Sequence, residues 1–161
     1  MPGRAPLTES PARPRVRASH WCFPGPPALL ARTGQPRQGL EKILQTIRAA
    51  TANDPSIGYW YLFAAEAELE LGQDQAALDW ALRADTFMPD SPLVKAWLAS
   101  IYATAGDKAA AAKYAAVLRK MSPTRTLLFM KKPMFTDAKV NDGQGLRIFK
   151  GLRLALGASP S

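Results

Sequence analysis

Apolar residues in segment 58–87 recur at intervals of three and four, the spacing that places side chains on one face of an α-helix. In 58–71 these residues are Tyr59, Leu62, Phe63, Ala67 and Leu71. A second stripe follows, made of Ala77, Leu78, Ala81 and Leu82. Gly72 separates the stripes, and glycine readily adopts the left-handed conformation that ends a helix. The pattern predicts two helices joined by a tight turn at Gly72.

The same arrangement returns 34 residues further on. This spacing separates Gly72 from Gly106, Ala77 from Ala111, and Pro89 from Pro123. One more step back from Pro89 reaches Pro55, which closes the apolar segment before it. We therefore predict a half repeat at 38–57 and full repeats at 58–91 and 92–125. Each proline lacks the N–H needed to continue a helix, so the chain is expected to turn there.

A 34-residue period made of two helices is the signature of the tetratricopeptide repeat, and residues 38–123 resemble that family. The resemblance implies an all-α fold, a short α-solenoid of stacked antiparallel helix pairs. It assigns Ala65 and Ala99 to the small position of the first helix in each pair. Tyr102 fits the position where the family carries a large residue, whereas Glu68 departs from it.

The chain outside these repeats differs at its two ends. Residues 1–37 hold more than half of the 14 prolines, show no helical or strand period, and are predicted to be a disordered Pro/Arg-rich tail. A transit peptide and a mis-assigned translation start are the alternatives for this tail. At the other end, 126–157 includes an apolar stripe and is predicted to cap the stack, because repeats leave an apolar face open: Leu146, Phe149, Leu152 and Leu156.

Composition limits the classes of function. The net charge of +8 is segmental, since segment 58–91 is acidic and both ends are basic, which argues against one nucleic-acid-binding face. No apolar run approaches the roughly 18 residues of a membrane span. The single cysteine excludes an internal disulfide and a cysteine-based zinc site, and it agrees with a reducing compartment. We expect a cytoplasmic protein.

Candidate chemistry is sparse. His20 and Cys22 lie in the predicted tail, where no scaffold would orient them as a catalytic pair. Glu66 and Glu70, one helical turn apart, are interpreted as a solvated acidic face rather than a cation site. GDKAAAAK lacks the phosphate-binding loop pattern, and NDGQG is interpreted as a turn. We predict no catalytic residue, no metal and no cofactor.

The basic C-terminal third offers a possible surface for nucleic acid or anionic lipid. Its charges have no interleaved aromatic residues for base stacking, so a solvated helix face is favoured: Lys131, Lys132, Arg147, Lys150 and Arg153.

The tetratricopeptide resemblance also implies a concave surface on the first helices of the pairs, where an extended peptide binds. The expected groove residues are Tyr59, Leu62, Glu66, Leu69, Glu70, Leu93, Ala96, Ser100 and Ala103.

A narrower resemblance covers about residues 38–157. The blocks DPSIGYWYLFAAEAELELGQDQAALDWALRA and LASIYATAGDKAAAAKY, with Gly151-Leu152-Arg153 in the last helix, are similar to the C-terminal repeat region of certain bacterial signalling proteins. Those proteins are headed by a class III adenylate/guanylate cyclase or a winged-helix domain. The resemblance implies a non-catalytic module that binds a protein or peptide partner. The alternatives are a cyclase or winged-helix regulator fragment without its effector domain, and a small basic nucleic-acid binder.

Overall fold

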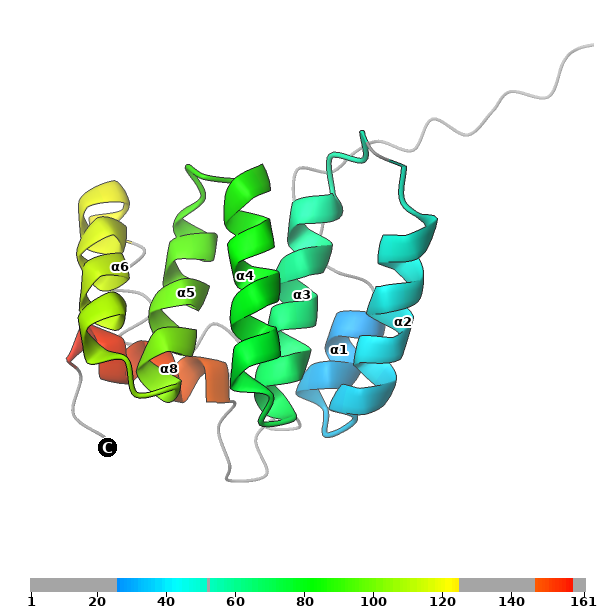
Figure 1. Cartoon of the computed structure of the whole chain (residues 1–161), viewed down its shortest axis with the longest axis horizontal. Helices are drawn as coiled ribbons and strands as arrows, with labels where there is room; N and C mark the ends of the chain where they lie inside the picture. The colour runs from blue at the N-terminus through cyan, green and yellow to red at the C-terminus, as the bar shows by residue number, and fades with distance from the viewer. Residues whose placement is uncertain (1–25, 52, 125–146, 158–161) are drawn as a thin grey trace, which may run out of the picture.

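The computed structural model describes residues 26–51, 53–124 and 147–157, and the regular structure in these ranges is helical (Figure 1). This confirms the predicted all-α fold, while residues 1–25 of the predicted tail lie outside the described ranges. The helices are α1 (Pro26–Arg32), α2 (Pro36–Ala49), α3 (Ile57–Glu70), α4 (Asp74–Phe87), α5 (Pro92–Thr104), α6 (Lys108–Met121) and α8 (Arg147–Leu156).

Helices α1 to α6 form three antiparallel pairs that stand side by side (Figure 1). Each pair turns on a glycine with a positive φ, which is 84° at Gly34, 79° at Gly72 and 86° at Gly106. A side chain is disfavoured in this conformation, so glycine ends the first helix of each pair there. The turns at Gly72 and Gly106 agree with the sequence pattern. The turn at Gly34 was not predicted.

Residues 26–37 correct the predicted start of the domain at residue 38. They form α1, the turn at Gly34 and the beginning of α2, so the predicted half repeat is a complete pair. The prediction treated the prolines as barriers to helix formation. However, Pro26 and Pro36 each stand at the first position of a helix, where the missing N–H costs no hydrogen bond.

Small residues occupy the places where paired helices approach most closely. Ala77 and Ala111 are buried at equivalent positions of α4 and α6. The corresponding residue of α2 is Gly39, where an added Cβ would lie 2.8 Å from the Ala31 nitrogen and from the Pro27 oxygen. Gly39 precedes Ala77 by 38 residues rather than 34, because the connection from α2 to α3 is longer than the one from α4 to α5 and because α3 is one residue longer than α5.

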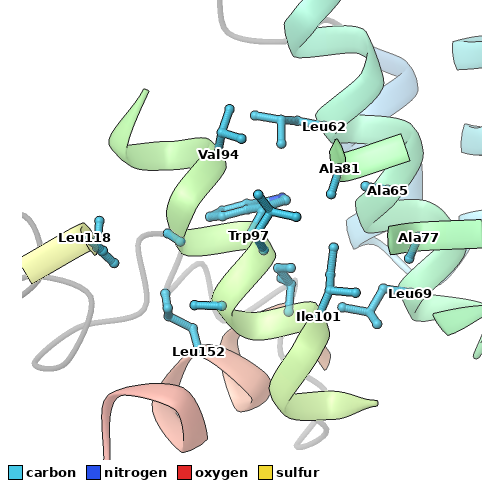
Figure 2. Close-up of a cluster of buried hydrophobic side chains, with 14 of the residues drawn as sticks. Leu62, Ala65, Leu69, Ala77, Ala81, Val94, Trp97, Ile101, Leu118 and Leu152 are labelled. Atoms are coloured by element: carbon cyan, nitrogen blue, oxygen red, sulfur yellow. The ribbon is translucent and has the colours of Figure 1, made fainter. Parts of the chain in front are cut away.

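The hydrophobic core lies between the pairs and centres on Trp97 of α5, which is 2% exposed. Figure 2 shows Trp97 with α3 and α4 side chains on one side and with Leu118 and Leu152 on the other. The core residues labelled there are Leu62, Ala65, Leu69, Ala77, Ala81, Val94, Trp97, Ile101, Leu118 and Leu152.

The departure at Glu68 has a structural counterpart. In the last pair, the rings of Tyr102 and Tyr114 stack with centroids 5.6 Å apart. The residues 34 positions earlier are Glu68 and Trp80, and interaction with the Trp80 side chain opposes the rise in the pKa of Glu68 that burial causes. A polar interaction thus takes the place of ring stacking between these two positions.

Helix α8 does not continue the stack. A further stacked helix would pack mainly on α6, as α3 packs on α2 and α5 on α4. Instead, α8 runs transverse to the pairs and packs mainly on α5, with smaller contacts to α3 and α6 (Figure 1). This corrects the predicted end cap for 147–156, whereas 126–146 lie outside the described residues. Within the described ranges, no helix is long and apolar enough to cross a membrane.

Candidate functional site

The first helices of the second and third pairs, α3 and α5, present equivalent side chains on one surface, which we call the inner face. It is formed by Glu66 and Glu70 of α3 and by Ser100 and Thr104 of α5. Glu66 and Ser100 occupy the same position in successive pairs, and Glu70 and Thr104 follow one helical turn later. The inner face therefore has two carboxylates on α3 and two hydroxyls on α5, the first helix of the next pair.

The predicted groove is covered by other parts of the chain. Leu62, Leu69 and Ala96 belong to the hydrophobic core, and Glu66 and Ser100 are buried as well. Glu70, Leu93 and Ala103 are half-buried, and Tyr59 is exposed. Helix α1 covers Glu66, and α8 covers Glu70 and Ser100. The expectation of an open groove is thus corrected, because α1 and α8 pack where a peptide was expected.

An ion pair joins α1 to the inner face. Arg32 donates to Glu66 from Nε to Oε1 at 2.5 Å and from Nη2 to Oε2 at 2.8 Å. The side chains are only 8% and 2% exposed. Burial by itself would lower the pKa of Arg32, but attraction and hydrogen bonding to Glu66 outweigh the burial, so the pKa is raised. Arg32 remains charged and holds Glu66 in a buried position.

Side chains of the inner face capture the start of α8. The Glu70 carboxylate accepts a hydrogen bond from the Ile148 N–H at 3.3 Å, and the Ser100 hydroxyl donates to the Ile148 carbonyl. The first N–H groups of a helix have no partner within the helix, and a negative charge there interacts favourably with the helix dipole. Glu70 therefore acts as an N-terminal cap supplied by another helix.

Arg147 and Arg119 complete the polar contacts of α8. Arg147 donates from Nη1 to the Leu69 carbonyl at 2.5 Å and pairs with Asp74 at 3.0 Å. At the other end, Arg119 of α6 donates to the Leu156 carbonyl at 2.8 Å. The last carbonyls of a helix also lack partners within the helix. Side chains of the stack thus satisfy backbone groups at both ends of α8.

Gly151 sets the distance between α8 and α5. A Cβ at this position would fall inside van der Waals contact with the Ser100 carbonyl oxygen and the Thr104 hydroxyl. Phe149 and Leu152, on either side of Gly151, are buried. The ring of Phe149 packs edge-to-face on the ring of Trp97, with the ring centroids 6.2 Å apart. Glycine in a helix interior lowers helix stability by roughly 1 kcal/mol relative to alanine. The close approach of α8 to α5 is the physical reason for a glycine at this position.

The inner face also changes the ionisation of Glu70. Burial raises the pKa of this carboxyl, and hydrogen bonds from the backbone of Ile148 and Arg147 oppose that rise. The neighbouring charge of Glu66 raises the pKa of Glu70 further.

Glu66 and Glu70 do not form the solvated face that was expected, because α1 and α8 each cover one of them. No group of three or more histidines, cysteines and carboxylates in the described residues is placed to hold a metal ion. His20, Cys22, Lys131 and Lys132 lie outside the described residues.

The basic stripe predicted on the last helix is divided. Arg147 turns toward Asp74, whereas Lys150 is exposed and Arg153 is half-buried. Sequence reasoning missed Arg32 and Arg119, which carry no local pattern that distinguishes them from surface arginines. Gly151 did carry a signal, since a glycine in the middle of a segment predicted to be helical is unfavourable unless a close contact requires it.

No protein-family model, curated protein or solved structure matches this chain in the comparisons with known proteins. The inner face and the elements packed on it are therefore the features that bear on its function.

Proposed function

We propose that this protein is a non-catalytic interaction module that binds a polypeptide partner on its inner face. The observation that carries the proposal is the capture of α8. Glu70, Ser100 and Arg119 bind backbone groups of α8, which are present in any helix of similar length. Such contacts suit the recognition of a polypeptide segment more than the recognition of a small molecule.

The tetratricopeptide resemblance supports the same proposal. Stacked helix pairs of that family present the first helices of their pairs to peptide ligands, and Glu66, Glu70 and Ser100 lie on those helices here. The narrower resemblance to bacterial signalling proteins supports a role as the partner-binding part of a cytoplasmic signalling protein. A cyclase or winged-helix fragment without its effector domain is the alternative.

A selection of displayed peptides against the full chain tests this proposal. We expect selected peptides to bind saturably, with affinity that changes little between low and moderate salt. Binding through the basic residues to nucleic acid would instead collapse with added salt, because it depends on counterion release. Failure to select any peptide, or conversion of ATP to cyclic AMP by the chain, would contradict the proposal.

The mapping variants follow from the burial of the groove residues. Leu62→Ala and Leu69→Ala remove core side chains and would lower stability, so they do not report on binding alone. Glu70→Gln is the better choice, because Glu70 is half-buried and contacts the backbone of α8.

A further inference from the structure

We propose that α8 occupies the inner face as an internal ligand, and that the partner is an amphipathic helix of the α8 pattern that replaces it. The pattern has arginine at its first position, large apolar residues at the second, third, sixth and tenth, and glycine at the fifth. The inference rests on the proposed function and adds to it the partner's chemistry and the element that competes with the partner.

The packing of α8 distinguishes it from the stack. Helices α2 to α6 each pack on the helix that precedes them, whereas α8 packs mainly on α5 and has smaller contacts with α6 and α3. Its contacts are to groups of α3, α5 and α6 on one surface of pairs that are already complete. An element of this kind can leave without separating one pair from the next.

The surface that α8 covers favours a helix with a basic first residue. Asp74 and the Leu69 carbonyl both receive the Arg147 guanidinium, and Glu70 lies beside them. An acidic residue in the place of Arg147 would meet two carboxylates, which would repel it. Charge complementarity therefore selects the start of the incoming helix.

The narrow space next to α5 requires a glycine in the middle of the incoming helix. Gly151 lies against the Ser100 carbonyl and the Thr104 hydroxyl, where no Cβ fits. Alanine has a higher helix propensity than glycine, so Gly151→Ala makes an isolated α8 segment more helical while preventing its docking. Because Gly151→Ala favours the helix and disfavours docking, its effect on binding reports recognition rather than helix formation.

The test measures the affinity of a labelled peptide for the wild-type chain and for the Gly151→Ala chain, and then repeats the measurement with a substituted peptide. The probe is a synthetic peptide of residues 146–157 with blocked ends, and binding is followed by fluorescence anisotropy. We expect the Gly151→Ala chain to bind it at least about tenfold more tightly than the wild-type chain, because a tethered competitor acts at an effective concentration of about millimolar. The same peptide with alanine at position 151 should bind at least about tenfold more weakly.

Two further variants control the interpretation. Lys150→Ala changes an exposed residue next to Gly151, and this chain should bind the peptide with the same affinity as the wild type. Arg147→Glu releases α8 through charge rather than through volume, and should also strengthen peptide binding. In hydrogen exchange, both releasing variants should lose protection in 147–156 and keep it in α3 and α5.

Three outcomes would overturn the inference. One is equal peptide affinity for the wild type and both releasing variants. Another is equal binding of the glycine and alanine peptides. The third is loss of protection in α3 and α5 in both releasing variants, because α8 would then be part of the stable stack. If displayed peptides still bind the wild type in any of these cases, the chain remains a polypeptide-binding module, and the inner face is not its binding site.

Discussion

Arg32 illustrates how one side chain changes the role of a whole segment. The Arg32 guanidinium on α1 forms an ion pair with the Glu66 carboxylate on α3, and both side chains are almost fully buried. Removing one partner of a buried ion pair leaves the other charge without compensation, which is more costly than replacing both partners.

We therefore expect Arg32→Leu to lower the free energy of unfolding by about 3–5 kcal/mol. The double variant Arg32→Leu/Glu66→Leu should recover most of that loss. Urea denaturation followed by circular dichroism measures both effects. Arg37→Leu, at an exposed position of α2, is the control and should change stability by no more than about 0.5 kcal/mol. A double variant no more stable than the single one would contradict the uncompensated charge.

Ala111 tests the closest approach within the last pair. It is 3% exposed, so Ala111→Leu should overpack the contact with α5 and cost roughly 1–3 kcal/mol. Ala109→Leu lies on the exposed side of the same helix and should cost much less. Thermal denaturation of the two variants makes the comparison, and equal costs would show that the close approach lies elsewhere.

Glu70 predicts a pH dependence with a definite sign. Burial raises its folded-state pKa above the usual value near 4.5, so the folded protein keeps a proton that the unfolded chain has already released. Stability from this group is present at low pH and is lost as pH rises through the raised pKa. The free energy of unfolding of the wild type should therefore fall relative to Glu70→Gln across that window. Urea titrations at several pH values measure the difference, and a constant difference would contradict the shift.

At the scale of the elements, glycine turns and small residues made α3 to α6 predictable from the sequence. Gly72, Gly106, Ala77 and Ala111 mark turns and close contacts that depend only on neighbouring segments. Helix α1 was missed because prolines at the first positions of α1 and α2 were counted as interruptions. The position of α8 was not predictable, because it depends on Gly151 meeting Ser100, and no local pattern encodes that contact.

Helix α1 changes the expected effect of shortening the chain. The sequence pattern alone treats residues 1–37 as dispensable, but Ala28, Ala31 and Arg32 are buried. A chain beginning at residue 38 should have a thermal midpoint at least about 10 °C lower, since Glu66 loses its ion-pair partner. A chain beginning at residue 26 keeps α1 and is the matched control. Equal midpoints for the two chains, measured by differential scanning calorimetry, would show that α1 contributes little.

At the scale of the whole molecule, contacts beyond nearest neighbours modify a linear stack. In a simple repeat protein each unit is stabilised by its neighbours only. Here α8 contacts α3, α5 and α6 together, so it links the second and third pairs on one surface. Arg32 links the first pair to the second in addition to their packed helices. The inner face thus adds contacts among the three pairs to those made by the packing of α2 on α3 and of α4 on α5.

The position of α8 along the chain has a consequence during synthesis. Domains generally fold from the N-terminus as the ribosome adds about 5–20 residues per second, so the segment 122–146 takes about 1–5 s to make. During that interval α1 to α6 have been synthesised and α8 has not. If α8 is the internal ligand that we propose, a partner present at the ribosome would meet the inner face before α8 covers it. Once α8 has docked, the same partner would have to displace a tethered helix, so we expect association to be easier during translation than after it.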